Sequence, residues 1–110
     1  MASKDFEISR IEKSLSVVLT GNLITEIIPD LKAALLTALE KETDGLVFDF
    51  SHISLVDSSG IGLLIAAYNS LSKTGGSIQV INANTQITEL LTSMRLSERF
   101  NMNKGSDKNP

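Results

Sequence analysis

The sequence predicts an α/β domain with a central, mixed but mostly parallel β-sheet of four to five strands, flanked by three to four α-helices. The pattern of hydrophobic residues along the chain predicts this class. Short runs with the hydrophobic pattern of strands alternate along the chain with longer runs in which hydrophobic residues recur every three or four positions. Strands that alternate with helices favour parallel pairing, because each helix carries the chain back across the sheet.

The first half of the chain is expected to form two strands and a helix. Hydrophobic residues alternate over residues 6–11 and 15–19, with a turn near residues 12–14. Pro29 suits the first turn of a helix, where its missing N–H costs nothing. The hydrophobic positions that follow it at helical spacing are Leu31, Ala34, Leu35, Ala38 and Leu39.

The second half is expected to form a strand, a helix, a strand and a helix. Residues 46–50 are apolar at most positions, as in a central strand covered on both faces. A helix follows over 61–71 and ends at Gly75-Gly76. After a strand over 78–81, Asn84 is expected to cap the last helix. The residues expected to face inward from this helix are Ile87, Leu90, Leu91 and Met94. A last short strand is an option around Phe100 and Met102.

Composition limits the class of protein. The chain has 110 residues, of which 42% are hydrophobic and 21% charged, so we expect one domain over residues 1–104 and a flexible tail over 105–110. The net charge of −3 argues against a broad nucleic-acid surface. No apolar run approaches the roughly 20 residues that cross a bilayer. The absence of cysteine excludes disulfides and thiol catalysis. From these features together we expect a soluble cytoplasmic protein.

The most informative stretch is segment 57–62, Asp-Ser-Ser-Gly-Ile-Gly, which lies between an expected strand and an expected helix. This order places Ser58 and Ser59 at a helix N-terminus. Free backbone N–H groups and the helix dipole favour an anion there, and a phosphate above all. A phosphoserine would suit such a position. From local chemistry alone, however, Ser58 is equally well explained as a capping residue.

The neighbouring residues also have two explanations each. Ser59 is either a capping hydroxyl or the acceptor of a phosphate, and Asp57 either caps the helix or fixes the turn. Gly60 and Gly62 permit close approach of the sheet or of a partner. Four apolar residues before the first helix are either core or an exposed docking patch; they are Leu23, Ile24, Ile27 and Ile28.

Segment 57–62, the strand over 46–50, Leu19-Thr20-Gly21 and the Gly75-Gly76 turn occur in the order and spacing of a STAS domain. The chain resembles a stand-alone bacterial anti-sigma factor antagonist from about residue 6 to residue 100. The resemblance implies that Ser58 is phosphorylated by a partner kinase, which is usually also the anti-sigma factor. It implies that the unphosphorylated protein binds this anti-sigma factor and that the phosphorylated protein releases it.

The resemblance also implies further partners and a contact surface. A PP2C-type phosphatase would restore the serine, and the protein would be a monomer or weak dimer without cofactor, metal or catalytic residues. The residues expected to contact the partner are Asp57, Ser58, Ser59, Gly60, Ile61, Gly21, Asn22, Leu23 and Ile24. The sequence departs from the family pattern Gly-Glu-Leu-Asp, because Ile24 stands in the place of the aspartate. Ile24 cannot supply a carboxylate for any role that this aspartate has in the kinase encounter, and the sequence does not tell what effect the replacement has.

Two other classes of function compare with this expectation. A STAS domain can also be a non-switching accessory subunit of a membrane transport ATPase or of another signalling complex, and it would use the same surface. An enzyme such as a nucleotide hydrolase is disfavoured, because the chain lacks a Gly-x-x-x-x-Gly-Lys-Ser/Thr loop and a base beside Ser58 other than Asp57. The single histidine, His52, is expected to be solvated in a turn.

Overall fold

The computed structural model describes residues 5–39 and 42–102 and contains the expected order of strands and helices. The strands are β1 (Phe6–Ile11), β2 (Ser14–Leu19), β3 (Gly45–Asp49) and β4 (Ser77–Ile81). The helices are α1 (Ile28–Ala38), α2 (Ser58–Ser72) and α3 (Thr85–Ser93), and a short 3₁₀ helix, η1 (Thr25–Ile27), leads into α1. The α/β class is confirmed.

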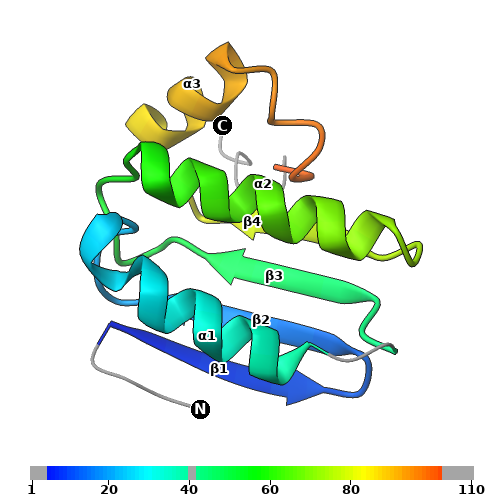
Figure 1. The fold of residues 1–110 in the computed structure, drawn as a ribbon. Helices are drawn as coiled ribbons and strands as arrows, with labels where there is room; N and C mark the ends of the chain where they lie inside the picture. The colour runs from blue at the N-terminus through cyan, green and yellow to red at the C-terminus, as the bar shows by residue number, and fades with distance from the viewer. Residues whose placement is uncertain (1–4, 40–41, 103–110) are drawn as a thin grey trace.

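The strands form one mixed sheet in the order β1-β2-β3-β4 (Figure 1). β1 pairs antiparallel with β2 through a tight turn, in which Glu12 has a φ of 58°. β2, β3 and β4 pair in parallel, and α1 and α2 are the crossover helices between them. The C-terminal ends of β2, β3 and β4 therefore lie at one edge of the sheet, and the connections that follow them begin there.

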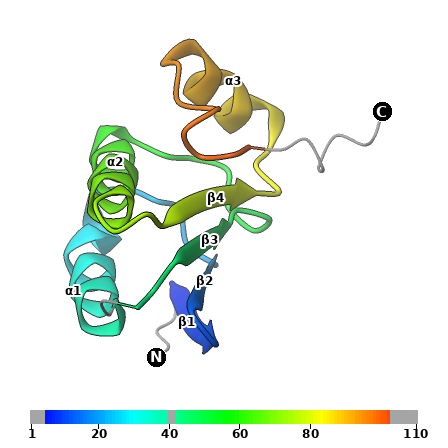
Figure 2. The same ribbon diagram turned by 90° about the vertical axis from the view of Figure 1, so that its right-hand side faces the viewer.

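Helices α1 and α2 cover the same face of the sheet, which Figure 2 shows edge-on, while α3 lies beyond β4. Buried residues alternate with more exposed ones along β2, β3 and β4. The expectation that the central strand is covered on both faces is therefore wrong. Leu46 and Phe48 face the helices, whereas Val47 and Asp49 are half-buried on the face over which the described residues place no helix.

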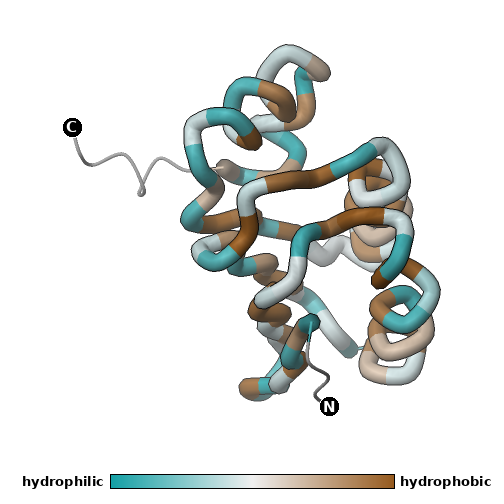
Figure 3. The backbone as a smooth tube through the Cα atoms, turned by 90° about the vertical axis from the view of Figure 1, so that its left-hand side faces the viewer, coloured by the Kyte–Doolittle hydropathy of each residue, from teal (hydrophilic) through white to brown (hydrophobic). Residues whose placement is uncertain are grey.

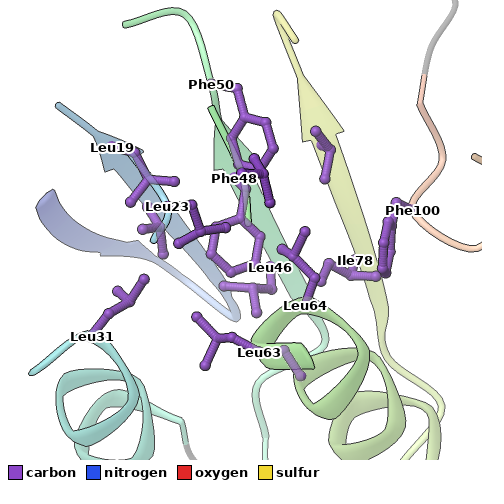
Figure 4. Packing of buried hydrophobic residues seen from close by; sticks show 14 of the residues in the cluster. Leu19, Leu23, Leu31, Leu46, Phe48, Phe50, Leu63, Leu64, Ile78 and Phe100 are labelled. Atoms are coloured by element: carbon purple, nitrogen blue, oxygen red, sulfur yellow. The ribbon is translucent and has the colours of Figure 1, made fainter. Parts of the chain in front are cut away.

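The hydrophobic core fills the space between the sheet and the helices. Figure 3 shows hydrophobic and hydrophilic segments alternating along the chain. In Figure 4, Leu63 and Leu64 of α2 lie beside Leu46 of β3. The largest fully buried side chains include Phe48, Phe50, Phe100, Leu15, Leu19, Leu23, Leu31, Leu46, Leu64 and Ile78. Each such side chain contributes about 1.5–3 kcal/mol relative to exposure.

The segment that follows α3 is a series of turns and not the short final strand that the sequence left as an option. Phe100 is fully buried, and its carbonyl accepts a hydrogen bond from the N–H of Val80 at 2.9 Å. The side-chain amide of Asn101 donates to the carbonyl of Ile78 at 2.8 Å. Asn101 has a φ of 45°, so the chain turns away after these contacts instead of extending along β4. Residues 105–110, the expected tail, lie outside the described residues.

The last helix has the expected cap but not the full expected inner face. The Oδ1 atom of Asn84 accepts a hydrogen bond from the N–H of Ile87 at 2.8 Å, and Ile87 and Leu91 are buried. Met94 is 45% exposed, so its predicted inward position is wrong. The helix ends one residue earlier, and Arg95 reverses the chain with a φ of 61°.

Candidate functional site

The candidate site lies where the connections after β2 and β3 meet. Leu23 and Val56 form an isolated parallel β-bridge. The N–H of Leu23 donates to the carbonyl of Leu55 at 3.1 Å, and the N–H of Asp57 donates to the carbonyl of Leu23 at 3.1 Å. Because β2 and β3 are parallel neighbours, these two connections leave the same edge of the sheet and can pair. This bridge brings residues 22–25 against the start of α2.

The side chain of Asn22 links the connection after β2 to the connection after β3 by hydrogen bonds. Its Oδ1 atom accepts hydrogen bonds from the N–H groups of Ser54 and Leu55, at 2.9 and 3.2 Å. One amide oxygen thus satisfies two backbone donors of a loop that has no secondary structure of its own. The contact fixes the path of the chain just before segment 57–62.

Asp57 is the N-cap of α2, which decides between the two structural roles that the sequence left open. Its Oδ1 atom accepts a hydrogen bond from the N–H of Gly60 at 3.0 Å. Its Oδ2 atom accepts hydrogen bonds from both the N–H and the hydroxyl of Thr25, at 3.0 and 3.1 Å. One carboxylate therefore caps α2 and ties that helix to η1.

The same contacts hold the pKa of Asp57 below its ordinary value. The largest cause is the hydrogen bond from the N–H of Gly60, which stabilises the charged carboxylate. Partial burial acts in the opposite direction. The N–H and hydroxyl of Thr25 and the N–H of Ser59 add to the lowering. Asp57 is therefore ionised at neutral pH and acts only as a hydrogen-bond acceptor.

The helix end is not the open anion site that the sequence suggested. The side-chain carboxylate of Asp57 already accepts a hydrogen bond from the N–H of Gly60. The backbone carbonyl of Asp57 accepts one from the N–H of Ile61 at 3.0 Å. The expectation that free N–H groups would cradle a phosphate is wrong for these two donors. A phosphate on Ser58 would instead add charge beside an existing carboxylate.

The two serines of the segment differ in their surroundings. Ser58 is the first residue of α2 and is exposed, and its hydroxyl has no hydrogen-bond partner within residues 5–39 and 42–102. Ser59 is half-buried, and its Oγ atom lies 2.9 Å from the Oγ1 atom of Thr25. Of these two serine hydroxyls, that of Ser58 is the one that is accessible and has no hydrogen-bond partner among the described residues.

The two glycines of the segment also differ. A Cβ atom on Gly60 would lie 2.4 Å from the carbonyl oxygen of Leu23 and 3.0 Å from a methyl carbon of Val56, so this position is needed for packing inside the domain. A Cβ on Gly62 would meet nothing within 4 Å, and Gly62 is exposed. The internal-packing explanation thus holds for Gly60 and fails for Gly62.

Several residues of the expected contact surface are inside the protein. Leu23 has no exposed surface, Gly60 is buried, and Ile61 is 8% exposed. These three residues pack beneath the site and can make almost no direct contact with a partner. The apolar stretch before α1 divides in the same way: Leu23 and Ile27 belong to the core, while Ile24 and Ile28 are half-buried. Gly21 and Asn22 are half-buried as well.

Sequence reasoning missed two residues of the site. Thr25 joins Asp57 to Ser59, and Leu55, in the loop before α2, is 51% exposed. The only sequence signal for Thr25 is a hydroxyl residue at the start of an expected helix, far along the chain from Asp57. Leu55 could not be distinguished from a core leucine, because burial is decided by the packing of the loop.

Features of other functional classes are not found in the described part of the chain. No group of three or more His, Cys, Asp or Glu residues there is arranged to hold a metal ion. His52 is exposed in its turn, as expected. Within the same residues, no helix is long and apolar enough to span a bilayer.

The chain is similar to known proteins in sequence and in fold. An anti-sigma-B factor antagonist of Staphylococcus aureus is 21% identical over 96 residues, which are 87% of this chain and 89% of that protein. The solved structure of SpoIIAA, a Bacillus cell fate determinant, in its phosphorylated form has a TM-score of 0.72 at 20% identity and covers 86% of each chain. An anti-sigma factor antagonist from Mycobacterium paratuberculosis has a TM-score of 0.73 at 21% identity, covering 86% of this chain and 80% of that one.

At these identities the solved structures show a shared fold. The family described as "Mlab, STAS domain" matches residues 6–102, which include the whole sheet, the three helices and the capped serine segment. The chain therefore belongs to the STAS domain family.

Proposed function

We propose that this protein is a phosphorylation-gated anti-sigma factor antagonist of the cytoplasm. In its unphosphorylated form it binds an anti-sigma factor that is also a serine kinase, and phosphorylation of Ser58 releases that partner. A PP2C-type phosphatase returns the serine to its free form. The chain itself performs no catalysis in this scheme, needs no cofactor, and acts as a monomer or weak dimer.

The observation that carries the proposal is the state of the Ser58 hydroxyl. It is exposed at the tip of α2 and without a partner among the described residues, so a kinase can reach it without unfolding the domain. The similar proteins named as anti-sigma factor antagonists, and the SpoIIAA structure in its phosphorylated form, support the same assignment.

The surface around Ser58 is suited to contact with another protein. Leu55 is a half-exposed apolar side chain in the loop that leads to α2, and Ile24 is half-buried in the neighbouring connection. Gly62 leaves open space on the exposed side of α2, one turn after Ser58. A partner that covers this surface would bring its own atoms close to the helix and would enclose the Ser58 hydroxyl.

Phosphorylation would oppose this contact by local electrostatics. A phosphate adds about −1.5 to −2 charges and must be desolvated when a partner covers it. The residue before Ser58 is Asp57, whose carboxylate is negatively charged. It therefore does not neutralise the charge that a phosphate on Ser58 adds. Like charges brought together in an interface cost several kcal/mol, and each 1.4 kcal/mol lowers affinity about tenfold. No large conformational change is needed.

Binding of the anti-sigma factor kinase from the same organism tests the proposal. We expect Ser58→Ala to bind as tightly as the unphosphorylated protein, and Ser58→Asp and the Ser58-phosphorylated protein to bind at least about tenfold more weakly. Ser59→Ala is the matched control and should bind like the unmodified protein. Calorimetric titration measures the affinities, and circular dichroism verifies that every variant is folded.

Equal binding by Ser58→Ala, Ser58→Asp and the phosphorylated protein would contradict the proposal. The alternative of a non-switching accessory subunit predicts another pattern. In that case no phosphorylated form would be isolated from the native cell, and a transport ATPase would co-purify equally well with both variants.

A further inference from the structure

The two adjacent serines of segment 57–62 pose a question of selectivity. Ser58 and Ser59 carry the same hydroxyl and lie in the first turn of the same helix. A kinase that docks on this tip therefore meets two chemically equivalent acceptors. Their difference comes from a third residue, Thr25, which the tertiary structure brings in from η1.

The direction of each hydrogen bond in this cluster follows from counting protons. The ionised carboxylate of Asp57 can only accept, so the Thr25 hydroxyl donates its single proton to Oδ2 at 3.1 Å. The Thr25 oxygen must then be the acceptor in its 2.9 Å contact with Ser59. The Ser59 hydroxyl proton is thus directed at Thr25, and the chain of donors runs from Ser59 through Thr25 to Asp57.

This arrangement disfavours Ser59 as a nucleophile. In the transfer, a bond forms between the serine oxygen and the γ-phosphorus of ATP, and the bond from that phosphorus to the bridging oxygen of ADP breaks. The serine proton passes to a base of the kinase. For Ser59 that proton is already donated inside the domain, and the residue is half-buried. For Ser58 neither obstacle exists.

We propose that Thr25 is the positioning residue that restricts phosphorylation to Ser58, because it holds the Ser59 hydroxyl in a hydrogen-bonded chain that ends on Asp57. This inference rests on the proposed function, in which a serine kinase acts on the tip of α2. It adds a determinant outside the serine segment, 33 positions before Ser58 in the sequence. Thr25 acts through Ser59 and does not itself react.

Two substitutions of Thr25 separate its hydroxyl from the rest of the residue. Thr25→Val keeps the β-branched shape and the backbone N–H that donates to Asp57, but it removes the hydroxyl. Thr25→Ser keeps the hydroxyl. Each is combined with Ser58→Ala, so that Ser59 is the only acceptor left in segment 57–62, and the full-length chains are expressed in the native cell with wild type beside them.

Peptide mapping by mass spectrometry then measures the phosphorylated fraction of each serine. We expect wild type to carry phosphate on Ser58 and the Ser58→Ala single variant to carry little on Ser59. In the Thr25→Val double variant the phosphorylated fraction of Ser59 should rise about two- to tenfold, the range expected from loss of one neutral hydrogen bond. The Thr25→Ser double variant should remain like the single variant.

A readout independent of the kinase tests the hydrogen-bonded chain itself. In an NMR titration of the side-chain carboxyl, the pKa of Asp57 should rise in Thr25→Val and stay near the wild-type value in Thr25→Ser. An unchanged pKa in Thr25→Val, or no gain of phosphate on Ser59, would overturn the inference while leaving the proposed function intact. Absence of phosphate from both serines in wild type would overturn the proposed function, and this inference with it.

Discussion

At the start of α2, the carboxylate of Asp57 occupies the helix N-terminus that would otherwise be open to an anion. Asp57 accepts the N–H of Gly60 and two hydrogen bonds from Thr25, so the negative charge that a helix N-terminus favours is already present. A phosphate on Ser58 would be a second negative group at the same end. Its cost in the isolated domain remains small because Ser58 is exposed and water screens the charge.

The lowered pKa of Asp57 predicts a pH dependence of stability. The folded state favours the ionised carboxylate, so this stabilisation is complete above the ordinary pKa of about 4. It is lost as the pH falls through the lowered pKa of the folded protein. We therefore expect the free energy of unfolding of wild type to decrease more steeply than that of Asp57→Asn as the pH falls below about 4.

Urea unfolding at several pH values measures this difference. Asp49 also has a lowered pKa: burial alone would raise it, but hydrogen bonds from Ser51 and from the amide of Asn82 outweigh that effect. Asp49 is present in both proteins, so its contribution cancels in the comparison. Parallel curves for wild type and Asp57→Asn would contradict the structural account of the cap.

The two glycines of the segment predict opposite effects of the same substitution. Gly60→Ala places a methyl group 2.4 Å from the carbonyl oxygen of Leu23, which is backbone and cannot move aside cheaply. We expect a loss of about 1–3 kcal/mol in the free energy of unfolding. Gly62→Ala meets no atom and should gain about 0.5–1 kcal/mol from helix propensity.

Chemical denaturation of both glycine variants against wild type checks the signs. If Gly62→Ala were destabilising, the open space at that position would be misassigned. If Gly62→Ala is more stable but binds the partner more weakly, the partner approaches α2 closely at Gly62.

Among the secondary-structure elements, the helix caps and the parallel strands determine where the site forms. β2 and β3 end at the same edge of the sheet, so the connections after them can form the bridge between Leu23 and Val56. The Asp57 cap then begins α2 directly after this bridge. The position of Ser58 is therefore a consequence of strand order as much as of its own sequence.

The cap of α3 gives a prediction for a single element. Asn84→Ala removes the oxygen that accepts the N–H of Ile87, and should lower the free energy of unfolding by about 1 kcal/mol. Gln86→Ala, on the exposed surface of the same helix, is the control and should change it by less than about 0.5 kcal/mol. Thermal denaturation distinguishes them, and equal effects would argue against a capping role for Asn84.

At the scale of the whole molecule, Phe100 attaches the C-terminal turns to the rest of the domain. Its ring lies 6.4 Å from that of Tyr68 in an edge-on arrangement, and its carbonyl accepts the N–H of Val80. The side chain has no exposed surface. These contacts join α2, β4 and the segment after α3 into one core, although that segment has no regular secondary structure.

Phe100→Ala is therefore expected to be among the most damaging substitutions outside the sheet. The cavity and the lost burial should cost about 3–5 kcal/mol, a large part of the 5–15 kcal/mol typical of a whole domain. Phe100→Leu should cost clearly less because it retains most of the volume. Urea unfolding measures both, and a loss under about 1 kcal/mol for Phe100→Ala would show that the segment packs loosely.

Much of the fold could be predicted because its signals are local. Alternation placed β1 and β2, Pro29 marked the first turn of α1, and Asn84 marked the cap of α3. The errors concerned burial at the ends and faces of elements. Met94 follows the helical period of α3, yet the chain turns at Arg95 and leaves it exposed. Val47 is apolar, yet it lies on the less covered face of the sheet.

The amino-acid sequence by itself determined the order of elements, the family resemblance and the serine segment at the start of α2, because each depends on residues that are neighbours along the chain. Only the tertiary structure decided that Leu23 and Gly60 are internal, that Leu55 is exposed, and that Thr25 lies against Asp57. These depend on contacts between segments about 30 residues apart, which form when two parallel strands end at one edge of the sheet.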